Sequence, residues 1–254
     1  PSGTLLAAPD AGTMPSRDDV WMRSASIAAN QPQRVASAVW IDDALGAVFA
    51  RLTSLGVMDT TLSIVVMDHG VGAKSAIYEQ GCRIMLAARL PGAFAAGSVV
   101  SAPVSNLDIA PTLLALATGQ STPPQQVQFD GVSLLVAADS GRSVYTELNK
   151  DRAVTQGTLK YIRKDVEANA GACAQGSGGA AGGVANRYPS FSDAVQLYDL
   201  ASDGAEQINL ASVAGYAVDL ARMQLLLDCH VAKTAIGVAP VYHDCDADPP
   251  GPPP

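Results

Sequence analysis

Three consecutive residues at the end of an apolar segment have side chains suited to metal chemistry. Asp68, His69 and Gly70 directly follow the segment 61–67, whose β-branched and apolar residues predict a strand covered on both faces. Ligands bind at the carboxyl ends of strands in open α/β sheets, and a glycine leaves room for a close approach. The carboxylate favours Ca²⁺ or Mg²⁺, and the imidazole widens the choice to Zn²⁺. The alternative for the bare tripeptide is a strand-end turn with a helix-capping aspartate.

A positive charge follows this triplet. Lys74 lies six residues after Asp68. A cation there can neutralise an anionic substrate held on a metal, which makes Lys74 a candidate catalytic residue. The alternative is a solvated surface lysine.

Strand and helix signals alternate around the triplet and indicate an α/β core. The periodicity of residues 35–55 predicts an amphipathic helix that stops at Gly56. Residues 83–89 predict a second strand, and residues 109–118 predict a helix with Asp108 as its N-cap.

The pattern changes after about residue 141. Short β-like segments predict strands at 143–147 and 195–199, and a hairpin folded about Gly157 within 153–163. Residues 213–231 predict a helix. We therefore expect a small antiparallel subdomain in this part of the chain.

Composition excludes several classes of protein. The 254 residues are 48% hydrophobic and 16% charged, which is typical of a globular chain. A net charge of −8 without a dense basic cluster argues against a nucleic-acid partner. The apolar runs are too short to span a bilayer. Because the sequence begins at Pro1 rather than Met, we expect a fragment or a processed form.

The order of several motifs resembles that of sulfatases, within the alkaline-phosphatase superfamily. Each motif is loose, but together they cover most of the chain, which looks like the C-terminal half of such a protein. In chain order they are Val39–Gly46, Asp68–Gly70, Lys74, Tyr78–Arg83, Arg89–Gly92, Val104–Leu114, Asp130–Leu134, Leu159–Ile162, and Leu197–Asp203 with Glu206 and Asn209-Leu210.

The resemblance implies a fold with distinct regions. We expect an α/β fold in which residues 35–140 form a parallel-sheet core with flanking helices. Residues 141–243 would form the small antiparallel subdomain, with a flexible glycine-rich insertion at 171–183. Residues 1–34 are expected to be an irregular lead-in, and the proline-rich tail 244–254 to be disordered.

The resemblance also implies an activity. Sulfatases hydrolyse sulfate esters with a formylglycine made from Cys or Ser and with a divalent metal, usually Ca²⁺. Asp68 and His69 match the strand-end metal ligands and Lys74 matches the sulfate-contacting lysine, whereas Glu79 and Arg83 are expected to be structural. The implied partner is a small-molecule or glycan sulfate ester. By analogy alone, the compartment would be extracellular, lysosomal or periplasmic.

Two departures from the family pattern leave alternatives open. Sulfatases carry an Asp-Asp metal pair and a Cys/Ser-x-Pro-x-Arg nucleophile motif, which we expect in a missing N-terminal part. Thr13–Arg17 imitates the nucleophile motif but lacks Cys or Ser, and Trp40–Asp43 imitates the metal pair but lies in a predicted helix. The alternatives are a truncated, catalytically silent binding module, or a phosphatase or phosphodiesterase of the same superfamily.

The four cysteines leave further alternatives. Cys229-His230 and His243-Asp244-Cys245 fit a zinc site poorly because no Cys-x-x-Cys pair strengthens them; a disulfide between Cys229 and Cys245, or free thiols, is favoured. Cys82 beside Arg83 is either a thiol with a lowered pKa or a packed small residue.

Overall fold

The chain divides into two compact units in a computed structural model. One unit comprises residues 1–63 and 88–96, and the other comprises residues 64–87 and 97–254, so the boundary expected near residue 141 falls inside the second unit. Lys74 and the insertion expected at 171–183 lie outside the described residues. The structure describes residues 14–70, 72, 76–124, 129–136, 141–165, 185–234 and 245–246.

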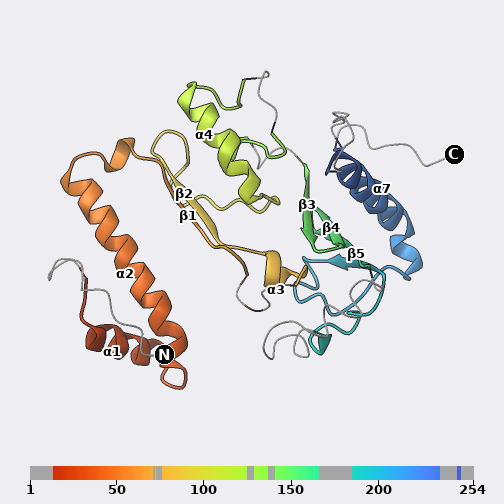
Figure 1. Ribbon diagram of the computed structural model, residues 1–254, viewed down its shortest axis with the longest axis horizontal. Coiled ribbons are helices and arrows are strands. Elements are labelled where there is room, and N and C mark those ends of the chain that lie inside the picture. Colours follow the sequence, from red (N-terminus) through yellow and green to blue (C-terminus); the bar gives the residue numbers. More distant parts are fainter. Residues whose placement is uncertain are drawn as a thin grey trace. The chain divides into compact units, whose positions relative to one another are not determined.

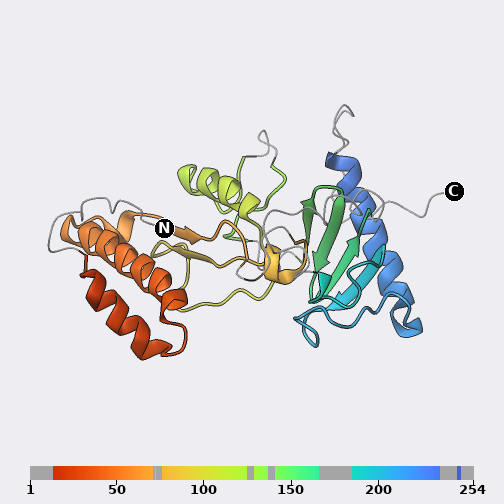
Figure 2. The same cartoon turned by 60° about the horizontal axis from the view of Figure 1, so that its bottom comes forward.

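The first unit is built on a helical hairpin. Helices α1 (Arg17–Ile27) and α2 (Pro32–Ser54) lie side by side (Figures 1 and 2). Helix α1 lies in the segment expected to be irregular, and this expectation is wrong for its residues. Its sequence has little hydrophobic contrast, but the Ser16 hydroxyl caps it by accepting a hydrogen bond from the Asp19 backbone N–H at 3.1 Å.

Helix α2 confirms the helix predicted over 35–55. The chain leaves it at Gly56, whose φ of +70° favours glycine. Trp40–Asp43 lies within α2, as the helical interpretation requires. Asp43 pairs with Arg23 of α1, with an Nη1–Oδ1 distance of 3.0 Å, which ties the two helices together. Asp43 is therefore part of a helix–helix contact.

The strands predicted around the Asp-His-Gly triplet are present but short. Strands β1 (Ser63–Val66) and β2 (Leu86–Arg89) form a two-stranded sheet, continued by a hydrogen bond from the Met67 N–H to the Met85 carbonyl at 3.1 Å. The expectation that β1 is covered on both faces is wrong here, because its residues are half-buried and Val66 is 42% exposed. Two strands do not establish the parallel core sheet, which stays a prediction.

A four-stranded antiparallel sheet forms the centre of the second unit, as the sequence predicts for the region after residue 141. Its strands pair in chain order. The predicted hairpin about Gly157 is confirmed, since Gly157 has a φ of +58° and Gln156 pairs with Leu159. The strands are β3 (Ser143–Leu148), β4 (Asp151–Gln156), β5 (Leu159–Arg163) and β6 (Val195–Asp199).

Alternate residues of this sheet build two separate cores, as the two-residue period of a strand requires. One face packs against helix α7 (Ala217–Thr234), which lies along the sheet (Figure 2). The other face packs against the segment before the short helix α3 (Glu79–Cys82) and against Tyr188. The first core contains Val154, Tyr161, Leu197, Met223, Leu226 and Leu227; the second contains Ala76, Ile77, Tyr78, Ala153, Ile162, Tyr188 and Tyr198.

Helix α4 (Ile109–Ala117) follows a 3₁₀ turn, Asn106–Asp108. Asp108 is the N-cap residue of this helix, as predicted, but its side chain makes no capping hydrogen bond to the helix. Ser105 is the capping residue of the 3₁₀ turn, and the Asp108 carboxylate reaches back to accept a hydrogen bond from the Ser105 N–H at 2.7 Å. Asp108 thus has the predicted N-cap position of α4, while its carboxylate takes part in the capping box of the preceding 3₁₀ turn.

Candidate functional site

The two predicted metal ligands lie together just beyond the end of β1. His69 Nε2 is 3.7 Å from Asp68 Oδ2, and the two side chains are 37% and 81% exposed. His69 Nδ1 lies 2.7 Å from the carbonyl oxygen of Gly70. Because a carbonyl only accepts hydrogen bonds, Nδ1 carries the proton in the neutral ring and the Nε2 lone pair is available to a metal.

Gly70 allows the backbone after this pair to pack against α3. Its N–H donates to the Gly81 carbonyl at 2.8 Å, and a Cβ at Gly70 would lie 2.4 Å from the Gln80 carbonyl oxygen. The close approach that the sequence suggested is thus an approach of the protein's own backbone. Only glycine fits there without a shift of the chain.

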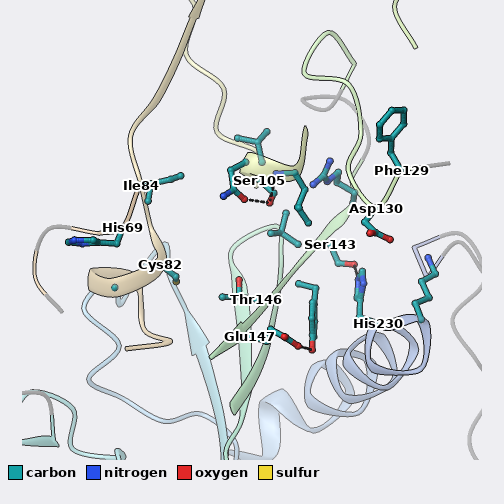
Figure 3. Close-up of a pocket in the computed structure, with 18 of the residues that line it drawn as sticks. His69, Cys82, Ile84, Ser105, Phe129, Asp130, Ser143, Thr146, Glu147 and His230 are labelled. Atoms are coloured by element: carbon teal, nitrogen blue, oxygen red, sulfur yellow. Dashed lines mark hydrogen bonds between the residues drawn. The ribbon is translucent and has the colours of Figure 1, made fainter. Parts of the chain in front are cut away.

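A pocket of about 540 Å³ lies beside the pair within the second unit (Figure 3). His69 and Cys82 lie on one side of the pocket, and Asp130 and His230 lie on the other. Strand β3 crosses between them, with Ser143 among its lining residues. The pocket is therefore shared between the α/β region that carries Asp68 and the antiparallel subdomain.

One wall of the pocket is organised by the buried carboxylate of Asp108. Its oxygens accept hydrogen bonds from the Ser105 N–H at 2.7 Å, from the Val132 N–H at 2.8 Å and from Arg142 Nη1 at 2.7 Å. The Asp108 side chain is fully buried and that of Arg142 is 8% exposed. This carboxylate neutralises Arg142 and fixes two loop segments of the wall.

A second buried charge cluster lies at α3. Lys160 Nζ, with the side chain 1% exposed, lies 2.9 Å from Glu79 Oε1, 3.0 Å from Glu206 Oε1 and 3.4 Å from Cys82 Sγ. Burial lowers the pKa of Lys160, but its interactions with these three neighbours outweigh burial and hold that pKa above its usual range. Lys160 thereby ties strand β5 to α3 and to the loop after β6.

The same environment corrects one interpretation of Cys82. Burial raises the pKa of the Cys82 thiol, although the nearby Lys160 ammonium opposes the shift. The lowered pKa considered for a cysteine beside Arg83 is not found, and Cys82 is a packed thiol. Burial also raises the pKa of the Glu206 carboxyl.

A third polar cluster anchors α7 to β3. His230 Nε2 lies 2.7 Å from Ser143 Oγ, and Asp246 Oδ1 accepts hydrogen bonds from Ser143 Oγ at 2.6 Å and from the Ser143 N–H at 2.8 Å. A disulfide joins Cys229 to Cys245, which confirms the pairing favoured over zinc. Burial lowers the pKa of His230.

Sequence reasoning missed these three clusters. The partners of Lys160 lie 46 to 81 residues away in the chain and those of Ser143 lie 87 and 103 residues away, so no spacing rule connects them. The one available signal for Lys160 is its position among the apolar residues of a predicted hairpin, where a lysine has no solvent face. His230 was noticed only as a candidate zinc ligand.

The donor chemistry of Asp68 and His69 fits a divalent cation, but it provides only two ligands. Across the described parts of the chain, no three histidine, cysteine, aspartate or glutamate side chains gather closely enough to hold a metal ion. Ca²⁺ takes six to eight oxygen ligands, so other groups would have to complete the site.

The fold and the site define the chain as an α/β protein with a strand-end aspartate–histidine pair beside a pocket. Residues 12–119, less than half of the chain, match the family model described as Sulfatase. The resemblance found in the sequence is thereby confirmed.

Individual relatives agree with this family. Over 115 residues the chain is 32% identical to steryl-sulfatase from Rattus norvegicus, an alignment that spans 37% of this chain and 20% of that protein. A structure solved with its substrate D-glucosamine-2-N,6-O-disulfate superposes with a TM-score of 0.60 at 22% identity, covering 79% of this chain and 40% of that one. A 2-O GAG sulfatase superposes with a TM-score of 0.57 at 20% identity, covering 91% and 53%.

These matches set the extent of the resemblance. The chain spans between a fifth and about half of the length of these relatives. The structural matches show a shared fold. In the described residues, no helix is both long and apolar enough to cross a membrane.

Proposed function

We propose that the chain takes part in the hydrolysis of sulfate esters by contributing Asp68 and His69 to a divalent cation site and Lys74 to sulfate binding. The observation that carries the proposal is the aspartate–histidine pair at the end of β1, which lines a pocket and whose Nε2 lone pair is available for coordination. The sulfatase match over residues 12–119 includes all three residues and supports their assignment.

Each residue has a distinct task in this proposal. Asp68 supplies a carboxylate oxygen and His69 supplies Nε2 to the cation, for which Ca²⁺ is the first choice and Mg²⁺ or Zn²⁺ the alternatives. The bound cation supplies positive charge next to the sulfate oxygens that gain negative charge in the reaction. Lys74 adds a second positive charge for the same anion. Gly70 keeps the pair in place by packing against α3.

The nucleophile is not accounted for by this sequence. The resemblance implies a formylglycine made from Cys or Ser in a Cys/Ser-x-Pro-x-Arg motif, and the sequence contains no such motif. The chain on its own is therefore proposed as a metal- and sulfate-binding part of the site. A catalytically silent binding module and a phosphatase of the same superfamily remain the competing functions.

Metal binding is the first test. We expect Ca²⁺ to bind the chain with a dissociation constant of about 1 mM, because two protein ligands leave most of its coordination to water. The double variant Asp68→Asn/His69→Gln should abolish the calorimetric signal. Asp130→Asn, an exposed carboxylate elsewhere in the pocket, should leave it unchanged. Equal Ca²⁺ binding by the wild type and the double variant would contradict the proposed site.

Anion preference is the second test. With Ca²⁺ present, the chain should bind an aryl sulfate more tightly than an aryl phosphate, and Lys74→Ala should weaken sulfate binding. A preference for the phosphate would favour the phosphatase alternative. Turnover of the aryl sulfate would exclude the silent module, whereas binding without turnover would support it.

A further inference from the structure

The pocket is larger than the proposed reaction centre requires. Its volume of about 540 Å³ lies within the range of sites that enclose whole drug-sized ligands, whereas a sulfate group is a compact anion. Asp68 and His69 are two of its lining residues, and His69 lies on one side of the pocket (Figure 3). The remaining space is large enough to receive the part of a substrate that carries the sulfate.

The lining of the pocket also offers a mixture of rings and polar groups. Phe129 and Tyr145 present aromatic surface, and Asn106, Asp130 and Thr146 present hydrogen-bonding side chains to the same space. Rings and hydrogen-bonding groups together suit a polyhydroxylated ligand, since each hydroxyl both donates and accepts. A smooth apolar ligand would leave these polar groups without partners.

Two cationic side chains of the described residues line this pocket, Arg142 and Lys233, and they differ in their pairing. Arg142 is neutralised by the buried Asp108 at 2.7 Å. Lys233 makes no ion pair with any carboxylate that the structure describes. Lys233 is thus a positive charge available to an anion that enters from solvent.

The helix that carries Lys233 is firmly held at this point. Lys233 lies three residues after His230, on the same side of α7, and both line the pocket. The contact of His230 with Ser143 fastens this turn of the helix to strand β3, and the disulfide joins Cys229 to Cys245. A cation on an immobilised turn loses less conformational freedom when it binds a ligand.

We propose that Lys233 forms a second anion subsite in this pocket, and that the substrate is a sulfated sugar bearing a further anionic group. The inference rests on the proposed function for the position of the first sulfate. The second anion is a sulfate or a carboxylate, because both present oxygens to an ammonium group. Asp130 would accept hydrogen bonds from sugar hydroxyls beside it.

Three sugars test the proposal by calorimetric binding to the whole chain in the presence of Ca²⁺. They are glucosamine 6-sulfate, glucosamine 2-N,6-O-disulfate, and a disaccharide in which a uronate is joined to glucosamine 6-sulfate. We expect one or both of the doubly anionic sugars to bind at least about tenfold more tightly than the single sulfate. The comparison between them identifies the second anion.

Variants assign the preference to Lys233. Lys233→Ala should reduce the preference for the doubly anionic sugars to about onefold, and Lys233→Arg should retain it. Lys150→Ala is the matched control, because it removes the same charge from an exposed lysine that does not line the pocket. The preference should also weaken as salt is raised.

The outcomes separate this inference from the proposed function. If Asp68→Asn/His69→Gln abolishes binding of all three sugars while Lys233→Ala keeps the preference, the sulfate site stands and the Lys233 subsite is wrong. Equal binding of all three sugars by the wild type also overturns the subsite. If none of the sugars binds, both proposals fail.

Discussion

Asp108→Asn is the substitution for which the structure predicts the largest effect relative to the change in shape. The Asp108 carboxylate is fully buried and accepts hydrogen bonds from the N–H groups of Ser105 and Val132 and from Arg142 Nη1. Asparagine has almost the same size but replaces one oxygen with an NH₂ group. One donor of the protein would then face another donor, and Arg142 would lose its counterion.

The magnitude follows from these contacts. Removing one partner of a buried ion pair costs about 3–5 kcal/mol, because the remaining charge is left uncompensated in a poorly solvated place. We therefore expect Asp108→Asn to lower the free energy of unfolding by about 3–5 kcal/mol. Asp130→Asn, which changes an exposed carboxylate in the same pocket, should stay within about 0.5 kcal/mol of the wild type.

Urea unfolding followed by circular dichroism measures the stability of both variants. The slope of the free energy of unfolding against urea concentration should not change if the compactness of the folded and unfolded states is preserved. The double variant Asp108→Asn/Arg142→Gln should be more stable than the sum of the two single effects predicts, because it removes the unpaired charge. A loss below about 1 kcal/mol in Asp108→Asn, or strictly additive single effects, would refute the reasoning.

Three other predictions concern stability. Lys160→Met should lower the free energy of unfolding by about 3–5 kcal/mol in urea titrations, and adding Glu206→Gln should restore part of the loss; no recovery would argue against the charge cluster. Burial lowers the pKa of His230 below its unfolded value of 6.5. At pH values just below 6.5 the unfolded chain therefore binds more protons than the folded chain, and the free energy of unfolding should decrease as the pH falls through this window. In His230→Gln the slope of stability against pH there should be smaller, and an unchanged slope would contradict this origin. Gly70→Ala should lower the free energy of unfolding by about 1–3 kcal/mol because the added methyl group would overpack against Gln80. Gly46→Ala, in open space within α2, should raise it by about 0.5–1 kcal/mol. Similar changes of the melting temperature in the two variants would contradict this prediction.

Local signals in the sequence predicted the antiparallel subdomain. Gly157 between two β-like segments was sufficient for the hairpin, because the turn requires a positive φ that glycine adopts at little cost. The apolar periodicity of residues 213–231 likewise predicted most of α7. Helix α1 was missed because its hydrophobic contrast is weak, and its polar cap at Ser16 carries the signal instead.

Long-range contacts were beyond the reach of sequence patterns. Asp68 and His69 could be proposed as a pair from the sequence because they are adjacent in the chain and follow a predicted strand. The partners of Lys160, in contrast, come from two other segments, and only the folded sheet brings them together. Asp108 is an intermediate case. Its residue type indicated the start of a helix, but no sequence pattern predicted its contact with Arg142, 34 residues away.

The Cys229–Cys245 bond has a practical consequence for anyone producing this protein. The bond closes a loop of 16 residues, for which the chain-entropy estimate is about 3 kcal/mol. Expression in a reducing bacterial cytosol would leave both sulfurs as thiols, and Asp246, the next residue after Cys245, would no longer be tethered beside Ser143. Recombinant material should therefore be made by an export route or refolded under a glutathione couple, and its thiol content titrated before any ligand is added.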